Sequence, residues 1–466
     1  MRWNAVAQVA VAIAQLVVTI ALVRLLAPAD FGRIALVYFV SGLVGLLDEG
    51  GLSTLIIARD ERDGQKLSLL FYQELLVGAV FAAGTAVLAP LLARLFDQPD
   101  LTVYLLVLAP VFVVTGPRRF YQSLFQRAFA FKSMGIVRII ASALFVLVTL
   151  VLAKADYGVW SLVYGLVVRL STESLGYLFV GLREFVPEAP SVRQWRTGYG
   201  RLGIAKLGER LMAYLIERID ILIIGKALGP GALGVYDVFK RFSLGLFQQV
   251  VPLVGRIALP HLARLQAEPR VLAKAYAKQL SYVCYALFPA YAFLAFFSHS
   301  IVAWVFGEQW IAYSAVFAWI SLLLLVRSIG IPIDALLMAR GFVKQEFLYS
   351  AGVVTVLAAT LITFVGDGLQ ATVVAVTWLY VMLTVPTYVW VVRPASYVRA
   401  GTYLKVISYP LLLAACTGLL GKGIAMSLER VTDGATVLGL CAAVLTFAMI
   451  SQQINPALRS RIKPVA

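Results

Sequence analysis

Long apolar segments recur along the whole chain, and polar residues gather in the short stretches between them. About 20 consecutive apolar residues are enough for a helix to cross the hydrocarbon core of a bilayer. The connections are too short to fold as separate domains, so any function must reside in the helix bundle. The pattern predicts fourteen such helices, at residues 5–26, 33–58, 67–92, 101–117, 136–153, 158–182, 200–228, 231–262, 276–306, 310–339, 347–366, 368–392, 403–424 and 434–454.

The composition excludes a water-soluble protein. Of the 466 residues, 61% are hydrophobic and only 14% are charged, and the mean hydropathy is +0.88. A soluble domain has about a quarter of its residues charged, because its surface must be solvated by water. A soluble enzyme, a nucleic-acid-binding domain and a disordered chain are therefore ruled out. The sequence predicts an all-α polytopic membrane protein.

The basic residues are distributed unevenly between alternate connections. The chain carries 40 Lys and Arg against 24 Asp and Glu, a formal net charge of +16. The connections after even-numbered predicted helices, with the C-terminal tail, hold 22 Lys and Arg, whereas those after odd-numbered helices hold 7. Cytoplasmic loops of membrane proteins are enriched in Lys and Arg. Both termini are therefore predicted to be cytoplasmic, and most of the net charge reflects topology.

Short motifs repeat along the chain at a nearly constant offset. The segment 24–32 (RLLAPADFG) returns at 226–234 (KALGPGALG), 202 residues later. Looser matches relate 94–99 to 304–309 and 127–132 to 340–344, at offsets of 210 and 213. These matches predict two copies of a six-helix unit in the same orientation, related by an axis along the membrane normal.

The repeat sets the predicted domain organisation. Two pseudo-symmetric six-helix lobes are expected, followed by two C-terminal helices outside the repeat. The predicted parts are an N-terminal lobe at 1–183, a cytoplasmic linker at 184–199, a C-terminal lobe at 200–393, and helices 13 and 14 with a cytoplasmic tail at 394–466.

Several of these motifs resemble those of the Wzx-type polysaccharide and lipopolysaccharide exporters, of the multidrug/oligosaccharidyl-lipid/polysaccharide superfamily. The resemblance covers nearly the whole chain. One departure lies at Asp48-Glu49-Gly50-Gly51, where the family usually has Asp-Phe-Gly-Leu-Gly. The matching segments are Leu25–Gly32, Asp48–Ser53, Arg127–Lys132, Asp156–Trp160, Asp220–Gly225, Leu233–Tyr236 and Phe306–Trp310.

The resemblance implies a flippase of the bacterial inner membrane. Such a protein has two six-helix lobes around a central cavity. It carries oligosaccharide linked to undecaprenyl pyrophosphate from the cytoplasmic to the periplasmic leaflet, for the synthesis of lipopolysaccharide or exopolysaccharide. The implied partners are the lipid-linked oligosaccharide, membrane lipids, and polysaccharide polymerase or glycosyltransferase machinery. No nucleic acid, metal or cofactor is expected.

Ionisable residues inside predicted helices are the candidate site residues, because burying charge in a bilayer is costly unless it faces a partner or a water-filled cavity. On helix 200–228, four of them with Tyr214 fall within one stripe about 120° wide. The candidates for substrate-binding cations are Lys206, Arg210, Arg241, Lys240, Arg327 and Arg169. The candidates for ion coupling or charge pairing are Asp48, Glu217, Asp220, Asp237, Asp334 and Glu173.

Two interpretations of these charges remain open. Cavity-lining Arg and Lys side chains would meet the pyrophosphate, for which the planar guanidinium fork is well suited. Alternatively, the charges pair with one another and lock the lobes together. The spacing of Arg169 with Glu173, and of Arg327 with Asp334, fits pairing. The carboxylates could likewise exchange a proton or bind Na⁺, or simply neutralise neighbouring cations.

Other functions compete with this one. A peptidoglycan-precursor flippase and a drug/cation antiporter belong to the same superfamily, but a drug antiporter typically has an acidic, aromatic cavity, which Lys206, Arg210 and Arg241 argue against. A membrane oligosaccharide polymerase or ligase usually needs a large periplasmic loop, and no connection here has room for one. The sequence contains no G-x-S-x-G, H-E-x-x-H or Walker A motif. No enzymatic activity is predicted.

Overall fold

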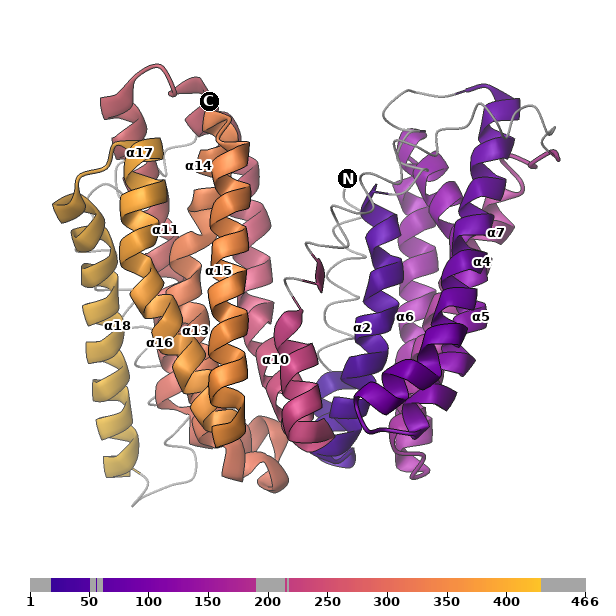
Figure 1. Ribbon diagram of the computed structural model, residues 1–466, viewed down its shortest axis with the longest axis horizontal. Coiled ribbons are helices and arrows are strands. Elements are labelled where there is room, and N and C mark those ends of the chain that lie inside the picture. Colours follow the sequence, from indigo (N-terminus) through magenta and orange to yellow (C-terminus); the bar gives the residue numbers. More distant parts are fainter. Residues whose placement is uncertain (1–17, 51–55, 57–61, 190–213, 216–217, 429–466) are drawn as a thin grey trace. The chain divides into compact units, whose positions relative to one another are not determined.

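The structure is a computed structural model that describes residues 18–50, 56, 62–189, 214, 215 and 218–428 (Figure 1). Within these residues every regular element is a helix. The chain divides into two compact units, Met1–Asp237 and Val238–Ala466. The predicted helix 434–454 and most of helices 5–26 and 200–228 lie outside the described residues, as does most of the predicted linker 184–199.

The described residues of the first unit form five helices and the start of a sixth. The predicted apolar segments match them to within a few residues at most ends. These helices are α2 (Pro28–Gly50), α4 (Gly64–Leu95), α5 (Asp100–Arg127), α6 (Phe131–Lys154), α7 (Val159–Gly181) and the beginning of α10 (Ile219–Arg264).

The second unit contains the rest of α10 and the remaining helices, several of which continue through short 3-10 or π-helical turns. The main helices are α11 (Pro269–Phe296), α13 (Ser314–Arg327), α14 (Ile331–Arg340), α15 (Val343–Phe364), α16 (Leu369–Thr387) and α18 (Ala400–Leu428). The short elements are α12 (Ser298–Ile301), α17 (Arg393–Ser396), η1 (Val302–Phe306), η2 (Glu308–Tyr313), η3 (Ser328–Gly330), η4 (Val365–Asp367) and η5 (Tyr388–Val392).

The helices have the length and surface of membrane spans. Nine helical segments of the described chain are long and apolar enough to cross a bilayer. On α4, Val80, Val87 and Leu91 are 60%, 74% and 60% exposed. Apolar side chains so exposed over several turns suit a hydrocarbon environment and are costly in water. The protein is therefore an all-α, multi-pass membrane protein, as predicted.

Two glycines allow α4 and α5 to pack closely. A Cβ atom at Gly78 would lie 2.5 Å from the carbonyl oxygen of Phe112, and one at Gly116 would overlap the carbonyl oxygen of Glu74. Small residues at such crossings let helix backbones approach, which is a common way to join helices in a membrane. The close approach brings polar groups of the two helices within hydrogen-bonding distance.

Aromatic side chains build the core of the second unit. The ring of Phe239 lies 5.2, 5.8 and 5.1 Å from those of Phe306, Trp310 and Phe317. All four side chains are almost fully buried. Edge-to-face and tilted rings at these separations attract one another in addition to burying apolar area. The segment around Phe306 and Trp310, one of the family-like motifs, therefore serves packing.

The structure corrects one helix boundary. The apolar segment 101–117 predicted that Arg118 and Arg119 lie in a cytoplasmic loop, but α5 continues to Arg127 and both arginines are buried. The apolar pattern ended at Pro117 because the next two residues are charged, although Pro117 is accommodated inside α5. Carboxylates on neighbouring helices pair with these arginines and make their burial possible.

Candidate functional site

The charge-rich stripe predicted on helix 200–228 is only partly described. Lys206, Arg210 and Glu217 lie outside the described residues, and of Asp48 only the backbone position, near the end of α2, is described. The described members of the stripe are Tyr214 and Asp220, and both are buried. The role of the stripe in binding substrate therefore remains a prediction.

Asp220 lies near the start of α10 and is held by hydrogen bonds. The hydroxyl of Tyr236 donates to its Oδ2 atom over 2.6 Å, and the backbone N–H of Ile221 donates to its Oδ1 atom over 3.0 Å. The bond to Tyr236 spans the kink in α10 at Gly229, whose φ of 77° interrupts the helix. The Asp220–Tyr236 hydrogen bond therefore links the segments on either side of the kink.

Tyr214, the other described residue of the stripe, contacts α2. The hydroxyl of Tyr214 donates to the carbonyl oxygen of Phe39 over 2.9 Å. Its ring also lies against Gly42, where a Cβ atom would overlap the Tyr214 hydroxyl. A larger residue than glycine at position 42 would push Tyr214 away from α2. The stripe thus has a structural role at this end, through direct contact with α2.

The two copies of the repeated motif contact each other reciprocally. A Cβ atom at Gly32 would overlap the carbonyl oxygen of Pro230, and one at Gly234 would overlap the carbonyl oxygen of Pro28. Pro28 and Gly32 correspond to Pro230 and Gly234 at the offset of 202 residues. The glycine of each copy contacts the proline carbonyl of the other copy, and such a reciprocal contact indicates a local two-fold axis between the copies. Beside this contact, Lys226 of the second copy pairs with Asp97, with Nζ and Oδ2 2.6 Å apart.

A buried ion pair joins α4 to α5. The Nε atom of Arg119 donates to Oε2 of Glu74 over 2.8 Å, and the two side chains are only 2% and 1% exposed. Arg119 also donates to the hydroxyl of Thr115 over 3.0 Å, while its Nη2 atom has no hydrogen-bond partner among the described residues. A charge this deeply buried is tolerated only when it is paired. Sequence reasoning missed this pair because it assigned Arg119 to a loop.

Glu173 of α7 forms a second ionic contact with two other helices. Its Oε1 atom lies 3.6 Å from Nη1 of Arg118 and 3.8 Å from Nε of Arg138. An ion pair with Arg169, one turn away, with which the spacing is compatible, is not among the contacts of Glu173 in the described residues. The guanidinium of Arg169 lies instead over the ring of Phe145, 5.9 Å from its centroid. Packing of α5, α6 and α7 brings Arg118 and Arg138 closer to the carboxylate than its neighbour on the same helix.

Comparison with known proteins assigns the family. The profile of the family described as "Polysaccharide biosynthesis protein" matches residues 21–315. The chain belongs to this family. The resemblance to polysaccharide exporters that the motifs indicated is therefore confirmed, and the ion pairs and the reciprocal contact described above are features of a polysaccharide biosynthesis protein.

Two bacterial proteins are similar to this family member over most of its length. The chain is 22% identical to the teichuronic acid biosynthesis protein TuaB of Bacillus subtilis over 419 residues, covering 88% of this chain and 86% of TuaB. It is 25% identical to the lipopolysaccharide biosynthesis protein WzxC of Escherichia coli over 353 residues, covering 75% and 71% of the two chains.

The fold of this family member also matches a solved transporter. The similar structure is the lipid II flippase MurJ in an inward closed conformation, with a TM-score of 0.72 and 13% identity over 98% of this chain and 100% of MurJ. This likeness shows that the chain shares the fold of that protein. The relatives and the fold support a membrane transport protein of polysaccharide biosynthesis.

The remaining predicted site residues of this polysaccharide biosynthesis protein lie on α10 and on α13 and α14. Asp237 is buried, Lys240 is half-buried and Arg241 is exposed. Lys240 and Arg241 belong to the second unit, whereas the described stripe residues Tyr214 and Asp220 belong to the first. The grouping of Lys206, Arg210 and Arg241 around one cavity stays a prediction.

Arg327 and Asp334 do not form the predicted pair within the described residues. The guanidinium of Arg327 lies over the ring of Tyr380, 5.3 Å from its centroid, and Asp334 is exposed. The 3-10 turn Ser328–Gly330 separates the two residues. A 3-10 helix has fewer residues per turn and a longer rise than an α-helix, so the turn changes the spacing between the two side chains. The seven-residue spacing alone could not reveal this turn.

The described residues contain no group of three or more His, Cys, Asp or Glu side chains that could hold a metal ion. The polar groups of this polysaccharide biosynthesis protein are instead isolated ion pairs, hydrogen bonds and cations stacked on aromatic rings. Such groups can fix helices and attract anionic ligands.

Proposed function

We propose that this protein is a flippase that moves oligosaccharide linked to polyprenyl pyrophosphate from the cytoplasmic to the periplasmic leaflet of the bacterial inner membrane. Its membership of the polysaccharide biosynthesis family and its similarity to WzxC and TuaB support this function. A lipid-linked sugar has a polar headgroup, which needs a polar path through the membrane, and a polyprenyl tail, which needs lipid. Apolar helices with ionisable groups among them can provide both environments.

The observation that carries the mechanism is the reciprocal contact of the two repeat copies. Gly32 faces the Pro230 carbonyl, and Gly234 faces the Pro28 carbonyl. The two copies of the motif present equivalent surfaces, and these surfaces contact each other through closely spaced backbones. They can separate as rigid bodies without breaking a helix. We infer that this contact closes the outer end of the transport path, and that its separation opens that path during alternating access.

The proposed architecture follows the repeat and the charge bias. It has fourteen transmembrane helices, with lobes at 1–183 and 200–393, a linker at 184–199 and two further helices within 394–466. Both termini lie in the cytoplasm. The segment between Arg24 and Arg33, which includes Pro28 and Gly32, is then on the periplasmic side.

The proposed substrate contacts are the cations of the helix stripes. Lys206, Arg210 and Arg241 would bind the pyrophosphate, with Lys240, Arg327 and Arg169 as further cationic candidates. A guanidinium binds two phosphate oxygens at once, which favours Arg for this contact. Asp220, held by Tyr236, and Glu217 would couple transport to a proton or Na⁺ gradient, with Asp48, Asp237, Asp334 and Glu173 as alternatives or pairing partners.

Transport by the purified full-length chain in proteoliposomes tests the function. We expect fluorescent oligosaccharide linked to undecaprenyl pyrophosphate to cross the bilayer only in vesicles that contain the protein. Collapse of the proton or the Na⁺ gradient should slow transport, because the proposed carboxylates need one of them. Transport of lipid II but not of the oligosaccharide lipid would instead identify a peptidoglycan-precursor flippase. Failure to move either lipid would contradict the proposal.

A further inference from the structure

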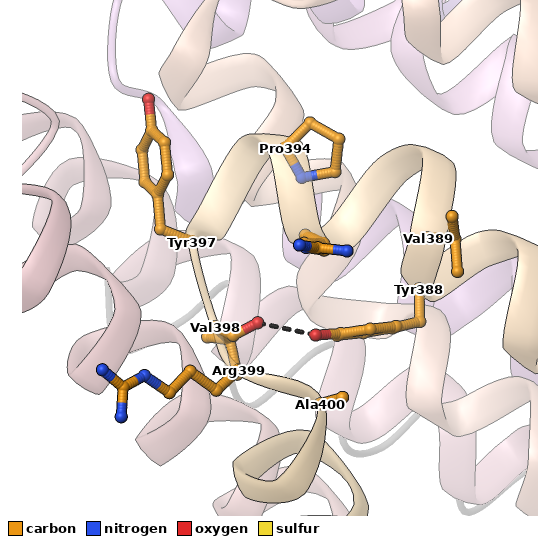
Figure 2. Close-up of a pocket in the computed structure, with 8 residues that line it drawn as sticks. Tyr388, Val389, Pro394, Tyr397, Val398, Arg399 and Ala400 are labelled. Carbon is orange, nitrogen blue, oxygen red and sulfur yellow. Dashed lines mark hydrogen bonds between the residues drawn. The ribbon is translucent and has the colours of Figure 1, made fainter.

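A pocket of about 750 Å³ lies in the second unit, where α16 ends and α18 begins. This volume is within the range of sites that bind small molecules and cofactors. The chain here changes from the π-helical turn η5 to the short α17 and then to α18, and Tyr397 between them has a left-handed φ of 60°. The lining residues, most of them labelled in Figure 2, are Tyr388, Val389, Arg393, Pro394, Tyr397, Val398, Arg399 and Ala400.

Hydrogen bonds hold the walls of this pocket in place. The hydroxyl of Tyr388 donates to the carbonyl oxygen of Val398 over 2.8 Å, as Figure 2 shows. The hydroxyl of Ser396 donates to the carbonyl oxygen of Val392 over 2.7 Å. Arg340 of α14 donates to the hydroxyl of Tyr397 over 2.8 Å. The unusual backbone is thus tied both to itself and to α14, so the pocket is preorganised.

Two arginines of the pocket are available for a ligand. Arg393 and Arg399 are both exposed, and within the described residues neither forms an ion pair or a side-chain hydrogen bond. The sequence contains no Asp or Glu between Asp367 and Glu429. Two guanidinium groups with no acidic residue near them in sequence, beside a concave surface, favour an anionic ligand.

The surroundings of the pocket match a membrane–water interface. Trp390 is 76% exposed and Leu404 is 63% exposed, next to the exposed Arg393, Arg399 and Lys405. Trp and Tyr side chains are enriched at the headgroup level of a bilayer, and arginines there contact lipid phosphates. The anion expected at this depth is therefore a lipid phosphate.

We propose that Arg393 and Arg399 bind the phosphate of a lipid headgroup in this pocket. The guanidinium groups contact the phosphate oxygens, Tyr388 and Tyr397 shape the walls, and the acyl or polyprenyl chain lies along the exposed apolar side chains. The ligand is an anionic phospholipid or a polyprenyl pyrophosphate, which share the phosphate chemistry. The second source rests on the proposed function, whereas the first requires only that the chain spans a membrane.

Lipid binding to the delipidated, full-length protein in detergent tests the proposal, with native mass spectrometry as the readout. We expect phosphatidylglycerol to bind more tightly than phosphatidylcholine, which carries no net charge. The variant R393Q/R399Q should bind phosphatidylglycerol about 30-fold more weakly, since each cation at a membrane surface contributes about 1 kcal/mol. The control R94Q/R183Q, which removes two exposed arginines outside the pocket, should bind as the unaltered protein does.

Two results would overturn the proposal: equal affinity of the unaltered protein for the two phospholipids, or unchanged phosphatidylglycerol binding in R393Q/R399Q. The variant R393K/R399K guards against misfolding, because it keeps both charges and should bind more tightly than R393Q/R399Q. Competition by undecaprenyl pyrophosphate distinguishes the sources: displacement of phosphatidylglycerol assigns the pocket to the polyprenyl lipid, and no displacement assigns it to the phospholipid. Phosphatidylglycerol binding is measured without transport, so failure of the flippase proposal would leave this result intact.

Discussion

At the scale of single residues, the buried charges of the first unit hold helices together. Glu74 and Arg119 are almost completely buried, and Glu173 meets Arg118 and Arg138 from two neighbouring helices. Removing one member of such a pair leaves an uncompensated charge in a low-dielectric environment, whereas replacing both by apolar groups is often close to neutral. The four helices α4 to α7 are thus joined by paired charges as well as by apolar contacts.

We expect Glu74→Gln to destabilise the protein by about 3–5 kcal/mol, because Arg119 would remain buried without its carboxylate. A lower midpoint of thermal unfolding in detergent would report this loss. The double variant Glu74→Leu with Arg119→Met should recover most of the lost stability. The control Glu184→Gln changes an exposed carboxylate of the same unit and should leave the midpoint unchanged. Equal midpoints for Glu74→Gln and Glu184→Gln would contradict the role of the pair.

At the scale of helices, the repeated motif has a specific packing function. The motif starts α2 in its first copy and lies at the kink of α10 in its second, where Gly229 has a φ of 77°. The glycine of each copy lets a proline carbonyl of the other approach the helix backbone. Hence the glycines are required by a close approach between the copies, and the prolines supply the carbonyls that are approached.

Gly234→Ala should weaken this contact, since its Cβ atom would overlap the Pro28 carbonyl. Overpacking costs about 1–3 kcal/mol, so we expect the closed arrangement to be disfavoured and transport to fall about tenfold. Gly32→Ala should behave in the same way, because the contact is reciprocal. Transport of lipid-linked oligosaccharide in proteoliposomes is the measurement.

Gly231→Ala is the matched control for this prediction, since it lies in the same motif and a Cβ atom there meets nothing within 4 Å. It should transport at the normal rate. If Gly231→Ala and Gly234→Ala lost transport equally, chain flexibility rather than the close contact would explain both.

At the scale of the whole molecule, the proposed transport path depends on the cations of the helix stripes and on the rocking of the repeats. We expect Arg210→Ala combined with Arg241→Ala to reduce oligosaccharide transport by at least about 100-fold. Each charge-assisted hydrogen bond to phosphate contributes about 1.5–3 kcal/mol, and two would be lost. Initial transport rates in proteoliposomes check this expectation.

Arg94→Ala combined with Arg183→Ala removes the same charge from exposed sites of the first unit and should leave transport unchanged. Normal transport in the Arg210 and Arg241 variant would contradict a cationic cavity. The charges of the stripes would then serve pairing between helices, as Glu74 and Arg119 do.

The sequence by itself determined the class of the protein, the positions of most described helices and its family. In the hydrocarbon core of a bilayer the backbone N–H and C=O groups of a long apolar segment must hydrogen-bond within that segment, so the segment forms a helix. Most helix ends could therefore be placed to within a few residues from the sequence. The repeated motif was also visible in the sequence, because close backbone contact at Gly32 and Gly234 restricts which residues fit there.

Only the tertiary structure decided which charges are partners. Local spacing was compatible with pairing of Glu173 with Arg169 and of Arg327 with Asp334. In the structure Glu173 pairs with Arg118 and Arg138 on other helices, and a 3-10 turn separates Arg327 from Asp334. The pocket lined by Arg393 and Arg399 likewise arises from π-helical and left-handed backbone, which no sequence motif predicts. Hydrophobicity acts residue by residue and is therefore readable along the chain. Ion pairing depends on which helices meet, and that is fixed only when they pack.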